Sequence, residues 1–483
     1  MVFSSLIFLF AFLPLTLILY YITPSRSIRN TVLFVMSLIF YAWGEPVYIS
    51  LMLLSILEAY ICGLFIAKYS DSNKKKAKFF MILSVCLNLV SLLFFKYCNF
   101  FIENLRLIPV FSGTPLIKNL VLPIGISFYT FQIISYTIDL YWKRTQVQKN
   151  FVAFGTYVAL FPQLIAGPIV RYRDVDDQII ERKETLELFT NGVKRFIIGL
   201  SKKIILGDTA AAIYEYCRSS MEFENTTLAA WMVMIFYTLH IYFDFSGYSD
   251  MAIGLGKMFG FRFLENFNFP YISASITEFW RRWHMSLSSW FKEYVYIPLG
   301  GNRKGLLKQY RNIAMVWLLT GFWHGASWNF IFWGAYFGAI LMLEKTFILK
   351  LLVKIPKVFR HIYALLLIGF GWIIFAFTDL SEIKNVFKAI FGIGVDSFST
   401  AVINYQFLIS LPFLAIAAIA ATPFPKMLYS KLCAVFNNKS EGITKIFGGL
   451  FQVITAIIWI LLLVICVAYM VDSTFSPFLY FNF

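Results

Sequence analysis

The stretch Arg311-Asn312-Ile313-Ala314-Met315-Val316-Trp317-Leu318-Leu319-Thr320-Gly321-Phe322-Trp323-His324-Gly325-Ala326 places a histidine inside an apolar run. No Asp, Glu, Lys or Arg occurs from Asn312 to Leu343, which is typical of a membrane-embedded segment. An ionisable side chain at that depth is unfavourable and therefore points to a functional site. The run predicts a helical membrane protein with His324 as its candidate reactive group. The alternative is a helix-packing histidine that bonds to a backbone carbonyl.

The composition of the whole chain supports a membrane protein. Of its 483 residues, 59% are hydrophobic and only 14% are charged, and the mean hydropathy is +0.71, far from an ordinary soluble domain. No polar stretch is long enough to enclose a core of its own. We therefore expect residues 1–483 to form a single membrane domain.

Apolar runs of spanning length recur along the chain. The first, residues 3–21, lacks a basic leader and a small-residue cleavage site, which predicts a retained span and not a signal peptide. Some runs are expected to be re-entrant or kinked, so we expect roughly ten to twelve crossings. The further runs are residues 30–44, 47–67, 79–101, 119–142, 150–170, 190–207, 228–247, 312–343, 361–377, 401–424 and 447–471.

The distribution of positive charge argues against a nucleic-acid partner, despite a net charge of +16. Lysine and arginine gather in short loops between apolar runs, as in Lys74-Lys75-Lys76 and Lys143-Arg144. This is the pattern of loops that stay on the cytoplasmic side of a lipid bilayer. With loops 22–30 and 68–78 in the cytoplasm, and the basic segment 426–445 there too, both chain ends are expected outside.

The sequence lacks the signatures of several chemistries. Its six cysteines show no CxxC pairing and mostly occupy apolar segments, so neither a zinc site nor a disulfide framework is indicated. It has no G-x-x-x-x-G-K-[ST] phosphate loop and no repeat of fixed period. We expect no metal, no bound cofactor and no ATP-driven engine in this chain.

A second histidine lies in the segment Ser275-Ile276-Thr277-Glu278-Phe279-Trp280-Arg281-Arg282-Trp283-His284-Met285-Ser286-Leu287. Aromatic residues are interleaved there with cations, which is typical of a membrane interface or the mouth of a polar cavity. Thr277 is expected to cap a helix. Two interpretations of His284 stay open: a functional group, or part of a helix anchored at the headgroup level by Trp and Arg.

These two segments carry a family resemblance. The order F-W-R-R-W-H-x-S-L-S-x-W-F, Y-I-P-L-G-G-N-R and L-x-T-G-x-W-H-G-A-x-W-x-F resembles the membrane-bound O-acyltransferases. It is similar to their bacterial branch, which includes alginate O-acetyltransferase membrane subunits, peptidoglycan acetyl-translocating subunits and teichoic acid D-alanyl transferases. The segments 122–132 (LPIGISFYTFQ), 161–169 (FPQLIAGPI) and 242–250 (YFDFSGYSD) extend the resemblance, which covers residues 1–345.

The resemblance implies an all-α polytopic enzyme of the bacterial cytoplasmic membrane, with re-entrant or interfacial helices around a central tunnel. It implies that an acetyl group moves from a cytoplasmic thioester to an outer acceptor, for O-acetylation of a cell-surface polysaccharide. CoA is too polar to cross and the acceptor is too large, so only the acyl group would pass. Acetyl-CoA is the expected donor substrate, with an acyl-carrier protein thioester as the alternative.

The resemblance also assigns roles to single residues. The invariant histidine of the family corresponds to His324, and its second polar residue corresponds to His284. Acyl transfer needs a base within reach of the attacking hydroxyl, and an imidazole accepts a proton near neutral pH. We expect His324 to be that base, and His284 to position the thioester carbonyl or the acceptor. Trp323 and Trp328 are expected to exclude water and wall the acyl chain.

Polar residues near these motifs are candidates for substrate contacts. Asp244 needs a partner at membrane depth, such as Ser246, a tyrosine hydroxyl or an arginine, and is expected to support the site indirectly. Cations near the second histidine are candidates for binding the CoA phosphates. Together with the asparagine of Y-I-P-L-G-G-N-R, these candidates are Arg281, Arg282, Lys292, Asn302, Arg303 and Arg311.

The chain ends in an aromatic tail, Phe475-Ser476-Pro477-Phe478-Leu479-Tyr480-Phe481-Asn482-Phe483. Such an apolar tail is expected to dock and not to be solvated. In the resembled family, a terminal motif built around tyrosine is linked to an acyl-tyrosine relay. This implies that Tyr480 takes the acyl group and passes it to a secreted SGNH-type acetyltransferase. The alternative is an aromatic anchor at the membrane surface.

Two other functions stay open on the sequence. A polysaccharide or lipid transporter would explain the hydropathy and the charge pattern, but it would not need the two histidine motifs. A scaffold subunit of an export complex would keep its function without His324. An acyltransferase would not.

Overall fold

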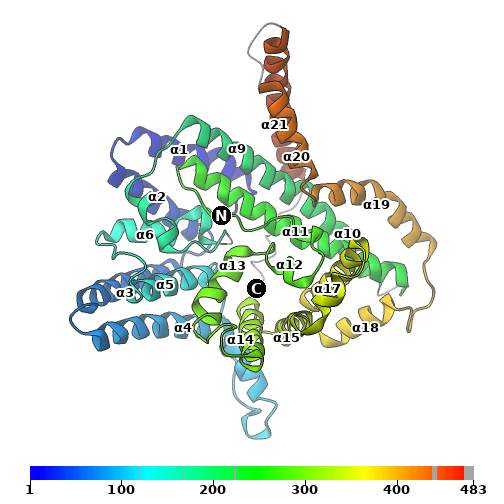
Figure 1. Ribbon diagram of the computed structural model, residues 1–483, viewed down its shortest axis with the longest axis horizontal. Coiled ribbons are helices and arrows are strands. Elements are labelled where there is room, and N and C mark those ends of the chain that lie inside the picture. Colours follow the sequence, from blue (N-terminus) through cyan, green and yellow to red (C-terminus); the bar gives the residue numbers. More distant parts are fainter. Residues whose placement is uncertain (119, 166, 222–224, 438–442, 473–483) are drawn as a thin grey trace.

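The computed structural model describes residues 1–118, 120–165, 167–221, 225–437 and 443–472. Every regular element in these ranges is a helix (Figure 1), which confirms the all-helical prediction. The long helices are α1 (Leu13–Ile22), α2 (Arg26–Ala42), α3 (Ile49–Tyr69), α4 (Lys74–Leu105), α5 (Ile126–Tyr141), α6 (Phe151–Ala159), α9 (Leu186–Ser201), α10 (Asp208–Ser220), α11 (Thr227–Met258), α14 (Leu306–His324), α15 (Trp328–Leu343), α17 (Lys357–Ala376), α18 (Leu380–Ile390), α19 (Ala401–Ala420), α20 (Phe424–Asn437) and α21 (Ile443–Asp472).

Short helical segments link or extend the long helices. The short α-helices are α7 (Phe161–Leu164), α8 (Asp176–Ile180), α12 (Ile276–Trp280), α13 (Met285–Phe291) and α16 (Leu349–Leu352). The π-helical segments are η1 (Phe8–Phe12), η4 (Lys202–Gly207), η6 (Lys292–Tyr296) and η7 (Glu344–Ile348). The 3-10 turns are η2 (Pro109–Phe111), η3 (Tyr172–Asp174) and η5 (Pro270–Ile272).

The core of the protein is built around α11, whose side chains are buried along most of its length. Helix α9 packs against it through small residues. A Cβ atom on Gly199 would lie 2.5 Å from the carbonyl oxygen of Gly247, and one on Gly254 would lie 2.7 Å from that of Gly192. Small residues at such crossings let two backbones approach closely, as is typical of helices packed in membranes.

Buried charges between α9, η4 and α11 are paired. Asp250 lies 2.6 Å from Arg195 and 2.8 Å from Lys202, and Asp244 lies 3.0 Å from Lys203. A charge in a low-dielectric interior is tolerated only with a partner. The two carboxylates therefore have cationic partners, as a location at membrane depth requires.

Six helices in the described part of the chain are long and apolar enough to cross a membrane. They support a multi-pass membrane protein, while the count of ten to twelve crossings stays a prediction. Several expected runs are broken: the run 150–170 is divided between α6 and α7, and the run 312–343 is divided between α14 and α15. The six candidate spans are Ile49–Tyr69, Lys74–Leu105, Thr227–Met258, Lys357–Ala376, Ala401–Ala420 and Gly449–Asp472.

Candidate active site

The histidine of the apolar run lies at a break between two helices. Helix α14 ends at His324, Gly325 takes an extended conformation with φ −169°, and α15 follows. The two helices approach closely, since a Cβ atom on Gly321 would lie 2.3 Å from the carbonyl oxygen of Phe330. The break places His324 at a helix end inside the protein, where it is only 4% exposed.

One ring nitrogen of His324 bonds to its own helix. Nδ1 lies 2.7 Å from the carbonyl oxygen of Thr320, and because a carbonyl only accepts, Nδ1 carries a hydrogen. In the neutral imidazole the lone pair is then on Nε2. The ring packs against Trp323, Trp333 and Phe375, with centroids 5.0, 4.8 and 5.5 Å away. This tautomer has the lone pair that a general base needs.

His284 lies between α12 and α13 with an unusual backbone conformation. Its φ is +43°, a left-handed value that is uncommon in residues other than glycine, and it is 1% exposed. The backbone N–H of the next residue, Met285, donates to the carbonyl oxygen of Asn266 at 2.9 Å and helps to hold the turn. Strained conformations of this kind persist where the surroundings hold them, and they cluster at functional sites.

The side chain of Asn266 determines the tautomer of His284. Its Oδ1 accepts from the backbone N–H of Ser286 at 3.2 Å and from the Ser286 hydroxyl at 2.8 Å. Because a backbone N–H can only donate, the Asn266 atom at this place is the oxygen. Nδ1 of His284, 3.1 Å from that oxygen, therefore carries the hydrogen. Nε2 is buried and has no hydrogen-bond partner in the described part of the chain.

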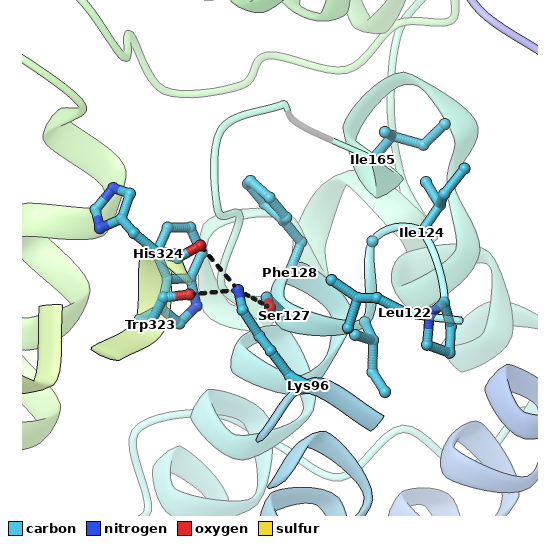
Figure 2. Close-up of a pocket in the computed structure, with 11 residues that line it drawn as sticks. Lys96, Leu122, Ile124, Ser127, Phe128, Ile165, Trp323 and His324 are labelled. Atoms are coloured by element: carbon cyan, nitrogen blue, oxygen red, sulfur yellow. Dashed lines mark hydrogen bonds between the residues drawn. The ribbon is translucent and has the colours of Figure 1, made fainter. Parts of the chain in front are cut away.

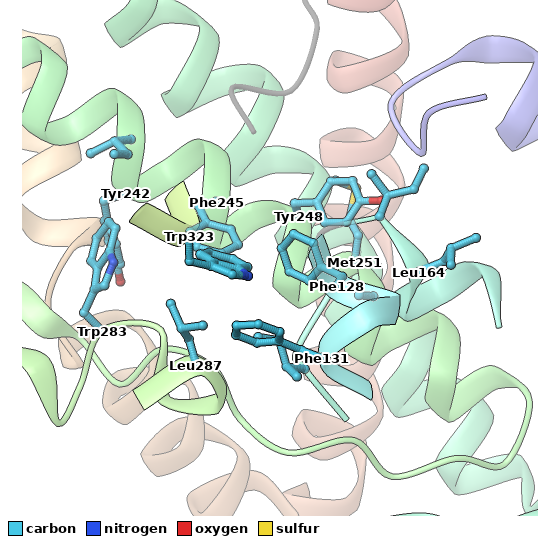
Figure 3. Close-up of a cluster of buried hydrophobic side chains, with 14 of the residues drawn as sticks. Phe128, Phe131, Leu164, Tyr242, Phe245, Tyr248, Met251, Trp283, Leu287 and Trp323 are labelled. Atoms are coloured by element: carbon cyan, nitrogen blue, oxygen red, sulfur yellow. The ribbon is translucent and has the colours of Figure 1, made fainter. Parts of the chain in front are cut away.

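Both imidazoles contact Trp323. The ring centroid of Trp323 lies 6.1 Å from that of His284 and 5.0 Å from that of His324. On its other sides the indole packs on Phe128 and Phe131, at 5.4 and 5.6 Å (Figure 3). The two histidines are thus brought to one aromatic cluster from segments forty residues apart in the sequence.

A cavity of about 30 Å³ opens beside His324 (Figure 2). Its wall is formed by Lys96 of α4, residues 122–128 before and within the first turn of α5, Ile165 and Trp323. A cavity needs about 10–15 Å³ of such volume to hold one water molecule. The cavity suits a few non-hydrogen atoms, and not a sugar or a CoA molecule. It also joins the motif at 122–128 to the histidine at 324.

The start of α12 is capped by residues other than the predicted one. Ser275 Oγ accepts from the backbone N–H of Glu278 at 3.0 Å. The buried carboxylate of Glu344 accepts from the N–H groups of Ile276 and Thr277, both at 2.7 Å. The prediction that Thr277 caps this helix is wrong, because the chain enters the helix one residue before it. Glu344 follows α15 directly, so it ties the segment of His284 to the α14–α15 hairpin.

The two tryptophans predicted to wall the acyl chain lie in different environments. Trp323 is buried, and it lines the cavity. Trp328 is 48% exposed, and its Nε1 donates to Oδ1 of Asn104 at 3.0 Å. It is not among the described residues that line the cavity.

The polar candidates divide into a buried and an exposed group. Asp244, paired with Lys203, and Ser246 are fully buried on α11. Arg282 lies 2.9 Å from Glu278. The remaining candidates are exposed or half-buried at the protein surface and do not line the described cavity: Arg281, Lys292, Asn302, Arg303 and Arg311.

The two remaining histidines of the chain bond to the backbone. His240 and His361 each direct Nδ1 to a backbone carbonyl, at 3.1 and 3.0 Å. Across the described ranges, no group of three or more His, Cys, Asp and Glu is arranged to hold a metal ion. The aromatic tail, residues 475–483 with Tyr480, lies outside the described residues.

Sequence reasoning missed two residues of the site. Lys96 interrupts the apolar run 79–101, so the rule that intramembrane ionisable residues are functional candidates would have found it. Asn266 gave no comparable signal, because a single asparagine in a polar loop between helices is common.

Known proteins resemble this chain over its whole length. The family described as membrane-bound O-acyltransferase matches residues 145–381. The probable alginate O-acetylases of Azotobacter vinelandii and Pseudomonas putida are 41% and 40% identical, each comparison covering 100% of both chains. The peptidoglycan O-acetyltransferase of Helicobacter pylori is 35% identical over 82% of this chain and 80% of its own.

Proposed function

Since this chain belongs to the membrane-bound O-acyltransferase family, we propose that it moves an acetyl group across the membrane from a cytoplasmic thioester to an outer acceptor. The family makes it a membrane enzyme that transfers acyl groups to oxygen. The observation that carries the proposal is the pair His324 and His284, which meet at Trp323. Relatives named for O-acetylation of alginate and peptidoglycan support a cell-surface polysaccharide as the final acceptor.

His324 is the general base in this proposal. Its Nε2 accepts the proton of the acceptor hydroxyl while the oxygen attacks the thioester carbonyl. A C–O bond forms, the C–S bond breaks, and the imidazolium returns the proton to the departing thiolate. The bond from Nδ1 to Thr320 supports this role, because it keeps the lone pair of the neutral ring on Nε2.

His284 orients the acceptor. Asn266 holds the hydrogen of the neutral ring on Nδ1, so Nε2 accepts a hydrogen bond and does not donate one. A hydroxyl can supply that hydrogen, whereas a thioester carbonyl cannot. Because the attacking hydroxyl has only one hydrogen, it bonds to His284 as it arrives and turns that hydrogen to Nε2 of His324 when it attacks. Of the two roles expected for His284, its tautomer therefore favours positioning of the acceptor over positioning of the thioester.

Acetyl-CoA is the proposed donor, with an acyl-carrier protein thioester as the alternative. The exposed cations Arg281, Lys292 and Arg303 lie in or after the His284 segment and are suited to the CoA phosphates. The small volume beside His324 supports entry of the acyl end alone. We place the enzyme in the bacterial cytoplasmic membrane, with basic loops in the cytoplasm, both termini outside and a tunnel joining the two sides.

Tyr480 is the proposed outer relay. The His324 imidazole takes the phenolic proton, and the phenolic oxygen attacks the thioester carbonyl. The C–S bond breaks, an acetyl-tyrosine ester forms, and the imidazolium gives its proton to the departing thiolate. A secreted SGNH-type acetyltransferase then accepts the acetyl group and transfers it to the polymer. The support for this step is the aromatic sequence of the tail.

The test uses purified protein in sealed vesicles with radiolabelled acetyl-CoA on one side. Release of free CoA thiol and transfer of label to acceptor on the other side are the expected results. A polysaccharide or lipid transporter would leave the thioester intact. If the chain were a scaffold subunit, the His324→Ala variant would support as much polymer acetylation as the wild type. The proposal would be overturned if the protein cleaved neither acetyl-CoA nor an acetyl-carrier protein thioester.

A further inference from the structure

The last turn of α14 ends without the usual backbone motif. An α-helix leaves its last four carbonyl groups without intrahelical donors, and a glycine in the left-handed conformation commonly closes such an end. Gly325 is extended instead, with φ −169°. The carbonyl groups of Phe322, Trp323 and His324 therefore need donors from another part of the chain.

Two consecutive residues of α4 supply these donors. The ammonium nitrogen of Lys96 lies 2.6 Å from the carbonyl oxygen of Trp323 and 3.1 Å from that of His324 (Figure 2). The hydroxyl of Tyr97 donates to the carbonyl oxygen of Phe322, and the two rings stack with centroids 3.9 Å apart. Side chains of a neighbouring helix thus cap the end of α14.

The contacts of Lys96 are those of a hydrogen-bond donor that holds a helix end. Its described hydrogen-bond partners are neutral oxygens: the two carbonyl groups and, at 3.5 Å, the hydroxyl of Ser127. A charge on a membrane-spanning helix is unfavourable and is kept where it has a function. The C-terminal end of α14 carries the negative end of the helix dipole, which stabilises a cation placed there.

We propose that Lys96 is a positioning residue for acyl transfer, whose ammonium group ends α14 and holds the backbone that carries His324. This inference rests on the proposed role of His324 as the base. Two anchors then fix Nε2: the bond from Nδ1 to Thr320 within the helix, and the bonds from Lys96 to the last two carbonyl groups. Without the ammonium, these carbonyl groups lose their donor and the last turn frays.

Hydrogen exchange tests this capping without any measurement of activity. In Lys96→Met, which keeps an apolar stem of similar length, the backbone amides of residues 320–328 should exchange about tenfold faster or more, as expected from the loss of hydrogen bonds to a charged group. The matched control is Lys78→Met, an exposed lysine on the same helix, which should exchange as the wild type does. Unchanged exchange in Lys96→Met would overturn the proposal.

Kinetics separates positioning from a purely structural role. Lys96→Met should lower kcat by about a hundredfold, since a shift of about 1 Å in a reacting group has effects of that size, while KM for acetyl-CoA stays within about twofold. Lys96→Arg, which keeps the charge and the donors, should recover part of kcat. Tyr97→Phe removes one neutral hydrogen bond and should have a smaller effect.

Each outcome of these experiments has a distinct meaning. Wild-type kcat in Lys96→Met would contradict the proposal, as would an equal loss in Lys96→Met and Lys96→Arg. If Lys96→Met does not fold, Lys96→Leu, which also lacks an N–H donor, replaces it with the same criteria. Absence of acyl transfer in the wild type would sink the proposed function instead, and the exchange experiment would still decide whether Lys96 caps α14.

Discussion

Nδ1 of His284 lies 3.1 Å from Oδ1 of Asn266, and this bond fixes which nitrogen of a buried imidazole keeps its lone pair. The same oxygen accepts from the backbone N–H and the hydroxyl of Ser286. Because a backbone N–H can only donate, the Asn266 atom at this place is the oxygen and not the nitrogen. A ligand-binding histidine commonly depends on a partner of this kind at its second nitrogen. In the proposed mechanism, Asn266 therefore sets the direction in which His284 holds an acceptor hydroxyl.

Replacement of Asn266 by alanine should lower turnover by about ten- to a hundredfold, because the tautomer and orientation of His284 are no longer fixed. Acetyl transfer per mole of folded protein is the measurement. Asn268→Ala is the matched control, since Asn268 is exposed and its bonds to Arg282 use backbone atoms. Equal activities of the two variants would show that Asn266 only stabilises the turn.

Replacement of His284 itself should have a strong but incomplete effect. Asparagine is the informative substitution, because it tolerates the left-handed backbone and so removes the imidazole without adding strain. We expect kcat to fall by about a hundredfold, less than after loss of the proton acceptor. An unchanged kcat and KM in both His284→Asn and His284→Ala would identify the residue as a buried packing residue with no part in acyl transfer.

The charge cluster around Glu184, outside the membrane spans, should make stability depend on pH. Burial opposes ionisation, but hydrogen bonds from Arg26 and Tyr20 outweigh it and lower the pKa of Glu184 to about 2. Its contribution is therefore present above the ordinary value of 4.5 and is lost as the pH falls through about 2.

Thermal unfolding in detergent would check this pH dependence. Glu184→Gln should unfold at a lower temperature than the wild type at pH 7, with a cost of about 3 kcal/mol for breaking a buried pair. The difference should shrink as the pH falls from about 4.5 toward 2. A difference that is the same at pH 7 and pH 3 would mean that the amide disturbs packing and not charge.

Tyr480→Phe should stop polymer acetylation, although it removes one hydroxyl and keeps the ring. A free tyrosine has a pKa near 10, so the phenol needs a base such as His324 before it attacks a thioester. Mass spectrometry of the C-terminal peptide, prepared without the downstream transferase, should find an added acetyl group on Tyr480. Wild-type acetylation by Tyr480→Phe would make the tail an anchor and leave His324 to serve a hydroxyl of another molecule.

Much of the fold class followed from composition and apolar runs, because a chain in lipid must satisfy its backbone internally and helices do so. The choice of His324 as the candidate base followed from its isolation in such a run. The break at Gly325 could not be predicted from the sequence, because periodicity cannot distinguish one long helix from a tight hairpin when both are apolar. Gly321 and Phe330 show the physical reason: backbone packing between α14 and α15 decides the path of the chain.

The composition of the candidate site was harder to predict than its central residue. Asn266 acts through one oxygen that collects three hydrogen-bond contacts, and nothing in its local sequence announces this. Trp328 was placed with Trp323 because the two share a motif, but the turn after His324 directs Trp328 outward, where it meets Asn104. Tertiary packing decides which residues of a shared motif reach the site.

His324→Gln compared with the wild type tests the central claim most directly. The substitution removes the proton acceptor and keeps a polar side chain of similar reach at the end of α14. Acetyl transfer from labelled acetyl-CoA is measured in membranes that contain equal amounts of folded, inserted protein. We predict a loss of about a thousandfold or more, in the range expected for removal of a general base. Acetylation near the wild-type level would contradict the assignment of His324 as the base.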